Sequence, residues 1–504
     1  MRSKNAIYNI ITNIFLQLII IVYGFLVPKI IISCFGSSVN GLVSSITQFL
    51  GYIALLESGF GPVLKATLYK PIALKNKIEI EKILASSNSF FKKIARVFII
   101  YILLLVVLYP LLINNQFSFG FSSTLIVIIS ISTLAEYYFG MTYRIYLQAE
   151  QKSYIISVIQ IVSYLVNIAL LFILVRFNAS IHLIKLMTGI VFIFRPIIQN
   201  LYVRKKYNIK INNKTEKAVI KQKWDGLAQH IAFVIHSNTD VTLLTIFCSL
   251  IEVSIYSVYK LVVNGVRSLA QIFTIGIDSS FGDIIAHNEQ ENLKNQFQVF
   301  EIICHSLNTI LFSCSFLLIV PFVSIYTANI TDADYIRLSF GRLIVISEFI
   351  WAIRLPYNTL VSAAGKFRET RKGAWVECIT NIIVSLILIK PLGLIGVVIG
   401  TIIAMTIRTC ELIYFTNKYI LKRGIMSSVK NIATIILLFI LIVVIGQYIN
   451  ILDNATFKEF LINGMIIFVF SLVLTCIFIF VLYHKEFSII LNKFFNIRKE
   501  ILKK

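Results

Sequence analysis

The sequence predicts an all-α polytopic membrane protein with about 14 transmembrane helices. Of its 504 residues, 58% are hydrophobic and 14% are charged, and the mean hydropathy is +0.84. Soluble domains are close to one quarter charged. Apolar segments of about 20 residues, the length that crosses a bilayer as a helix, recur along the whole chain. Because the polar segments between them are too short for a soluble domain, we expect the fold to lie within the membrane.

The first apolar segment follows two basic residues, as the core of a signal peptide would. It is too long for that role and continues past Pro28 without a small-residue cleavage site, so we expect it to be the first membrane helix. The apolar runs and their breaks predict helices at 7–33, 39–64, 94–114, 120–147, 154–175, 179–202, 226–249, 254–285, 297–326, 333–362, 374–390, 392–419, 431–451 and 459–483.

Lysine and arginine are concentrated in the segments that follow even-numbered helices. Cytoplasmic loops carry such an excess, so topology explains most of the formal charge of +23 without a nucleic-acid partner. The pattern predicts that both termini are cytoplasmic. The segment after the eighth helix, AHNEQENLKNQ, is nearly neutral and is the exception. The lysines of the first such segment are Lys65, Lys70, Lys75, Lys77, Lys82, Lys92 and Lys93.

The longest basic segment, at 204–225, follows the sixth predicted helix and could join two bundles of six helices. We expect an N-terminal lobe at 1–203, a cytoplasmic linker at 204–225 and a C-terminal lobe at 226–420. Two extra helices and a basic cytoplasmic tail fill 421–504. FGSSVNGLVSSI in the second helix is similar to CSLIEVSIYSVYKL in the eighth, and parallel repeats with substrate between them are a known transporter plan.

The eighth predicted helix carries a polar stripe. Its members recur at spacings of four and three, which places them on one face, and charges within a membrane usually line water or pair with neighbours. We expect Lys260, Asn264, Arg267 and Gln271 to bind substrate and Asp278 to take part in coupling or gating. A structural ion pair or snorkelling is the alternative for Lys260. The stripe consists of Lys260, Asn264, Arg267, Gln271, Thr274 and Asp278.

His236 and Asp240 lie four residues apart in the seventh predicted helix. A histidine beside a carboxylate can titrate near neutral pH, so the pair is a candidate for carrying a coupling proton. A hydrogen-bonded pair that joins two helices is the alternative.

Glu57 lies near the end of the second predicted helix, in LLESGFGPVLKATLYKP. Two nearby glycines and Pro62 favour a local break, so Glu57 is a candidate gating residue at a hinge-like helix end. An ion pair with Lys65 or Arg144 is the alternative.

Five more charges lie within predicted helices and are secondary cavity candidates: Glu136, Arg144, Arg195, Glu348 and Arg354. The three arginines lie toward predicted cytoplasmic helix ends, where snorkelling also explains them. The seven cysteines are scattered without metal-ligand spacing. We therefore expect neither a metal nor a cofactor, and transport would be coupled to H⁺, Na⁺ or the membrane potential.

Three stretches resemble the polysaccharide repeat-unit flippase family of the multidrug/oligosaccharidyl-lipid/polysaccharide (MOP) exporter superfamily. The family's second-helix motif, with Leu-Glu-x-Gly-x-Gly and Leu-Tyr-Lys-Pro elements, is similar to the first of them. The stretches are VNGLVSSITQFLGYIALLESGFGPVLKATLYKP, NTDVTLLTIFCSLIEVSIYSVYKLV and RLPYNTLVSAAGKFRETRKGAWVECITNIIVSLILIKPLGLIGVVIGT. The resemblance implies two six-helix lobes around a central cavity, plus two C-terminal helices.

The resemblance also implies a function. The chain would move undecaprenyl-pyrophosphate-linked O-antigen or capsule repeat units to the outer leaflet of the bacterial cytoplasmic membrane by alternating access. Its partners would be that lipid-linked oligosaccharide, membrane lipids, and a polysaccharide polymerase with its assembly proteins, and the chain would not be an enzyme. Lys260 and Arg267 would complement the charge of the pyrophosphate.

Three alternatives stay open. A cation-coupled multidrug exporter of the same superfamily would use embedded acids such as Asp240 and Asp278. A membrane-embedded polysaccharide polymerase or glycosyltransferase is disfavoured by the short predicted outer loops. A non-transporting scaffold in polysaccharide assembly would tolerate neutralisation of Lys260 or Arg267.

Overall fold

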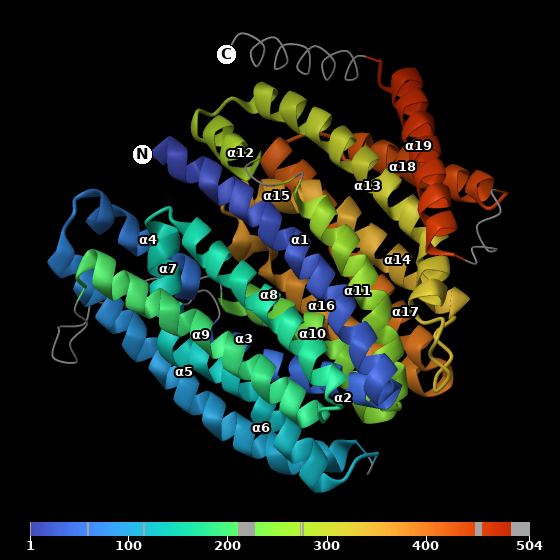
Figure 1. Ribbon diagram of the computed structural model, residues 1–504. Coiled ribbons are helices and arrows are strands. Elements are labelled where there is room, and N and C mark those ends of the chain that lie inside the picture. Colours follow the sequence, from blue (N-terminus) through green and yellow to red (C-terminus); the bar gives the residue numbers. More distant parts are fainter. Residues whose placement is uncertain are drawn as a thin grey trace. The chain divides into compact units, whose positions relative to one another are not determined.

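The computed structural model describes residues 2–57, 60–113, 116–209, 227–272, 274, 277–448 and 456–484, and its regular elements there are all helical (Figure 1). Within these ranges, 12 helices are long and apolar enough to cross a membrane. The predicted all-helical polytopic fold is thereby confirmed, and the expected number of about 14 helices roughly agrees. Apolar helices of this number indicate a multi-pass membrane protein.

The chain packs as two compact units, of which the first contains Met1–Ser257 with Ile330–Ala333. In this unit α1 packs on α8, α8 on α9, and α6 on both α5 and α9, and Figure 1 shows α8 and α9 running side by side. The helices are α1 (Arg2–Phe35), α2 (Ser37–Gly51), α3 (Ala54–Glu57), α4 (Phe60–Ala73), α5 (Lys77–Leu112), α6 (Phe119–Ala135), the π-helix η1 (Glu136–Gly140), α7 (Met141–Ala149), α8 (Ser153–Arg176), α9 (Ile181–Tyr207) and α10 (Leu227–Phe247).

The second unit contains Val258–Asn329 with Asp334–Lys504, and α11 (Leu250–Ile272) passes into it from the first. Here α17 packs on α16 and α14, and α13 packs on α14, α18 and α19. The remaining helices are α12 (Ile277–Ala286), α13 (Gln290–Tyr326), α14 (Leu338–Ile353), α15 (Leu355–Ala363), α16 (Phe367–Leu392), α17 (Leu394–Phe415), the π-helix η2 (Thr416–Leu421), α18 (Met426–Gly446) and α19 (Phe457–Leu482). The predicted lobe limits stay a prediction, because most of the linker at 204–225 and the basic tail lie outside the described residues.

The second predicted helix, at 39–64, is interrupted. Helix α2 ends at Gly51, and α4 begins at Phe60 with Pro62 in its first turn, where the missing N–H of proline costs little. The predicted basic loop that follows is largely helical. Helix α5 already begins at Lys77, because the Asn76 side chain caps it by accepting a hydrogen bond from the Glu79 N–H at 3.2 Å.

Two other predicted helices are each divided. The segment 254–285 forms α11, which ends at Ile272, and α12, which begins at Ile277. The segment 333–362 forms α14 and α15, which meet at Arg354. Asp278 lies on α12 and Lys260 and Arg267 lie on α11, and residues 273, 275 and 276 between these helices lie outside the described part of the chain. The single polar face through Asp278 therefore stays a prediction.

Candidate transport site

Lys260 and Arg267 lie two turns apart on α11 and bind one carboxylate, that of Glu348 on α14. The Lys260 Nζ donates to Glu348 Oε1 at 2.6 Å, and the Arg267 Nη1 donates to Oε2 at 3.3 Å. The Glu348 side chain has no exposed surface, whereas those of Lys260 and Arg267 are 26% and 22% exposed. Two cations on one carboxylate leave the cluster with one net positive charge, within reach of solvent or ligand.

Arg267 also lies over an aromatic ring. Its guanidinium carbon is 3.9 Å from the ring centre of Trp351, which follows Glu348 by one turn on α14. A guanidinium carries five N–H donors, so the contact with Glu348 leaves donors for a further anion. The ring holds the guanidinium plane in place while those donors stay available.

Asn264 and Gln271 extend this face of α11 with polar, uncharged side chains. Both are exposed, and they flank Arg267 at spacings of three and four residues. Beyond them the helix ends, and the Thr274 hydroxyl donates to the Gln271 carbonyl at 2.8 Å. The exposed Asp278 carboxylate, in the first turn of α12, accepts from the Ser279 N–H at 3.0 Å. The continuous part of the stripe thus runs from Lys260 to Gln271.

Arg354 belongs to a second, balanced group of charges, which lies close enough to act electrostatically on Arg267 and Glu348. Its Nη1 donates to Glu377 Oε1 at 2.5 Å, and Arg408 Nε lies 3.9 Å from Glu377 Oε2. Arg408 also donates to Glu411, one turn along α17. Two cations meet two carboxylates here, so the group has the properties of a structural network. The sequence analysis missed Glu377, Arg408 and Glu411, although the spacing of Arg408 and Glu411 is a readable helix pair.

His236 and Asp240 both lie on α10, in the first unit. Asp240 is buried, and its Oδ2 accepts a hydrogen bond from the Tyr256 hydroxyl of α11 at 2.8 Å. His236 is half-buried one turn earlier. The pairing of His236 with Asp240 stays a prediction, and Tyr256 is a partner of Asp240 that the sequence did not indicate.

Glu57 is half-buried at the end of α3 and accepts a hydrogen bond from the Tyr137 hydroxyl at 3.1 Å. Arg144, one of the two ion-pair partners considered for Glu57, lies 3.3 Å from Glu136 instead. The two residues after Glu57 lie outside the described part of the chain, so the hinge-like helix end stays a prediction.

Glu136 and Tyr137 begin the π-helix η1, which joins α6 to α7. Single π-turns inside α-helices are frequent at functional sites. A side chain at Gly140, the last residue of η1, would come within 2.5 Å of Pro196 Cβ on α9. Glycine is therefore needed for the close approach of η1 and α9.

Arg195 lies near the middle of α9, 12 residues before its end at Tyr207, or about 18 Å along the axis. Its guanidinium carbon is 4.3 Å from the ring centre of Tyr164 on α8 and 3.7 Å from that of Phe192. The side chain is packed against these rings, so snorkelling to a helix end does not explain it.

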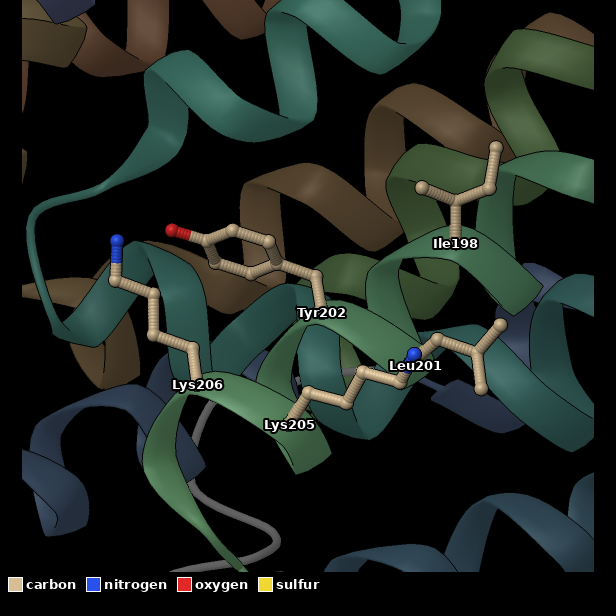
Figure 2. A pocket seen from close by; sticks show the side chains of 5 residues that line it. All are labelled: Ile198, Leu201, Tyr202, Lys205 and Lys206. Carbon is tan, nitrogen blue, oxygen red and sulfur yellow. The ribbon is translucent and has the colours of Figure 1, made fainter.

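A shallow pocket lies at the C-terminal end of α9 (Figure 2). Its floor is apolar, and two lysines stand at its rim. Figure 2 shows the side chains of Tyr202 and Lys206 extending in the same direction from the helix. The pocket is lined by Ile198, Leu201, Tyr202, Lys205 and Lys206.

The expectation of no metal site stays a prediction. No three His, Cys, Asp or Glu side chains in the part of the chain that the structure describes are arranged to hold a metal ion, and the seven cysteines are free thiols. The chemistry available at these sites is the binding of charged and hydroxylated ligands.

No protein-family profile and no curated protein matches the chain by sequence. Solved structures do match. A structure of the lipid II flippase MurJ in an inward closed conformation aligns with a TM-score of 0.67 at 16% identity, covering 95% of this chain and 99% of that one.

Two MATE transporters align as well. An inward-facing multidrug resistance MATE family transporter of the MOP superfamily gives a TM-score of 0.59 at 13% identity, covering 83% of this chain and 99% of its own. The eukaryotic MATE transporter AtDTX14 gives 0.57 at 13% identity, with 86% and 99% covered. The chain therefore has the fold of these MOP-superfamily proteins.

Proposed function

We propose that the chain is a flippase that moves polysaccharide repeat units, bound to undecaprenyl pyrophosphate, from the inner to the outer leaflet of the bacterial cytoplasmic membrane. The observation that carries the proposal is the pair Lys260 and Arg267 on α11. Both cations are partly exposed, they share a single buried carboxylate, and they retain one net positive charge. Charge of this sign inside a membrane protein suits an anionic ligand.

A pyrophosphate is such a ligand. Its oxygens can accept from the donors of Arg267 and Lys260 that Glu348 does not use, and these charge-assisted bonds are strong where water is scarce. The exposed amides of Asn264 and Gln271 offer hydrogen bonds to sugar hydroxyls on the same face. The polyprenyl chain can remain in lipid. A moving charge gains or loses about 2.3 kcal/mol per 100 mV of membrane potential, enough to drive transport in one direction.

Coupling to an ion would take place in the first unit. Asp240 is a buried carboxylate beside Tyr256, with His236 one turn away, and Glu57 lies at a helix end beside Tyr137. Either carboxylate can exchange a proton or hold Na⁺ as its surroundings change. The fold supports a lipid-linked substrate, since the MurJ structure to which the chain is similar is named a lipid II flippase. A polymerase and assembly proteins would receive the transported units.

A cation-coupled multidrug exporter is the second candidate. Asp240 favours it, because a carboxylate that is only 7% exposed within a membrane helix would attract an organic cation. The MATE transporters of the same fold are multidrug resistance proteins by name. The two candidates differ in which unit carries the ligand site: α11 and α14 for the anion, or α10 for the cation.

The test is complementation in a bacterium that lacks its own repeat-unit flippase and carries a matching sugar pathway. Surface polysaccharide is measured for the native chain, Lys260→Ala, Arg267→Ala and the control Arg371→Ala, which removes an exposed charge on α16. We expect polymer from the native chain and the control, and a loss of at least tenfold in the two α11 variants at equal membrane levels.

Equal polymer from all four chains would reject the α11 site. No polymer from the native chain, together with lowered ethidium accumulation that depends on Asp240, would favour the exporter. Retained export after neutralisation of both cations is also the result expected of a non-transporting scaffold. A transport assay in reconstituted vesicles then distinguishes the two, because only a flippase moves the lipid itself.

A further inference from the structure

Helix α9 carries a second line of cations, away from the residues of α11. Seven residues recur along it at spacings of three and four and so share one face. Two of the cations, Lys185 and Arg195, lie within the helix, and the third is at its end. The line comprises Lys185, Thr188, Phe192, Arg195, Gln199, Tyr202 and Lys206.

Arg195 is the centre of this line. Its guanidinium lies over the rings of Phe192 and Tyr164. The Nε and Nη2 atoms are buried and have no hydrogen-bond partner among the described residues. These two nitrogens form one edge of the guanidinium plane, the edge that binds a carboxylate or phosphate through two parallel bonds.

No acidic side chain among those described neutralises Arg195. The carboxylate whose charge acts on it, Glu136, is bound to Arg144 at 3.3 Å. Lys185, half-buried on the same face, forms no ion pair in the described part of the chain either. A half-buried cation within a membrane helix is costly without an anion, so the presence of two such cations on one face of α9 points to an anionic ligand.

The neighbouring helices add polar groups to this site. Asn167 on α8 is 2% exposed, and its Oδ1 accepts from the Tyr23 hydroxyl of α1 at 3.2 Å. Its Nδ2 is buried without a partner among the described residues. The ring centres of Tyr23 and Tyr164 are 4.8 Å apart, so α1, α8 and α9 contribute to one cluster.

The pocket at the end of α9 continues the same face. Lys206 lies 5.3 Å from the ring centre of Tyr202, and both line the pocket together with the apolar Ile198 and Leu201 (Figure 2). Lysines next to an apolar floor suit a lipid whose headgroup is anionic. From Lys206 to Arg195 the distance along the helix is about 16 Å, at 1.5 Å per residue.

We propose that the α9 face is a binding site for the phosphate group of an anionic lipid, with Arg195 as the bidentate ligand and Lys206 at the entrance. The lipid's apolar chain lies against Ile198 and Leu201. Arg195 recognises the phosphate through Nε and Nη2, and Tyr164 and Phe192 hold the guanidinium plane in place. Binding requires no transport, and it involves only residues of the first unit.

Purified full-length chain in detergent tests this site with farnesyl pyrophosphate as the lipid probe, inorganic pyrophosphate as the free anion and farnesol as the uncharged lipid. Affinity is measured by microscale thermophoresis. We expect Arg195→Gln to weaken binding of farnesyl pyrophosphate by roughly 10- to 100-fold, the range for a charged hydrogen-bonding group. Arg195→Lys keeps the positive charge but cannot form two parallel hydrogen bonds, so its affinity should lie between those of the native chain and Arg195→Gln. The control Arg176→Gln, exposed at the end of α8, should bind as the native chain does.

Three results would overturn the proposal: native affinity in Arg195→Gln, equal binding of farnesol, or tighter binding of inorganic pyrophosphate than of the lipid. If Arg195→Gln is not monodisperse, Arg195→Lys and Tyr164→Phe provide the same comparison. Lys260→Ala and Arg267→Ala should retain the binding. A failure of export therefore counts against the proposed function but does not affect the proposal of an α9 site. Loss of farnesyl pyrophosphate binding in Lys260→Ala or Arg267→Ala would instead mean that the ligand binds at α11.

Discussion

Glu348 holds two cations with a carboxylate that water does not reach. Glu348→Gln removes the carboxylate that Lys260 and Arg267 share on one face of α11. Breaking a buried ion pair on one side costs about 3–5 kcal/mol. We expect the variant to melt at a lower temperature than the native chain, measured by thermal unfolding in detergent.

Glu369→Gln is the matched control, since Glu369 and its partner Lys366 are largely exposed and pairs of that kind contribute little. Adding Lys260→Met to Glu348→Gln removes one of the two repelling charges and should recover part of the loss. An unchanged melting temperature in Glu348→Gln would mean that the cations do not depend on this carboxylate.

The sequence identifies the charged residues but not which ones pair. Lys260 and Arg267 stand out because each is a charge within an apolar helix, whereas Glu348 lies 88 and 81 residues away from them. Only the packing of α14 against α11 makes it their common partner. Arg195 was assigned to a helix end because the predicted sixth helix is basic there. Its aromatic contacts with α8 could not be read from spacing along α9.

At the scale of elements, η1 depends on Gly140. A methyl group there would meet Pro196 Cβ at 2.5 Å and Pro196 Cα at 3.2 Å, so α9 would have to move away. Overpacking of this kind costs about 1–3 kcal/mol. We expect Gly140→Ala to lower the melting temperature, and to weaken lipid binding at Arg195 because that residue directly precedes Pro196.

Gly265→Ala provides the contrast, since a methyl group at this helical position has no neighbour within 4 Å among the described residues. Replacing a helical glycine by alanine without a clash stabilises by roughly 0.5–1 kcal/mol. If the two variants shifted the melting temperature equally, the approach of η1 to α9 would not be the cause.

Apolar runs predicted the existence of most helices better than their ends. The helical start of α5 is polar, so a search for apolar segments began that helix at 94 instead of Lys77. The signal was present, because Asn76 followed three residues later by Glu79 is an N-cap pattern.

For the whole molecule, the number of membrane crossings decides the sidedness of every loop. Helices α14 and α15 have 16 and 9 residues, and neither alone meets the length of a span. Joined at Arg354 they extend for about 39 Å, more than the roughly 30 Å of a hydrocarbon core. The excess of basic residues after α15 predicts that this end is cytoplasmic.

We therefore predict that Ala328 and Lys366, which flank this pair of helices, lie on opposite sides of the membrane. Both are exposed, so Ala328→Cys and Lys366→Cys should be tolerated. In intact cells a membrane-impermeant maleimide should label Ala328→Cys above the background of the native cysteines, and Lys366→Cys only after the cells are opened. Labelling of both from outside would mean that α14 and α15 do not cross together. Each helix after α15 would then have the opposite orientation. The basic charge of the loops beyond α15 would then need an explanation other than a cytoplasmic location.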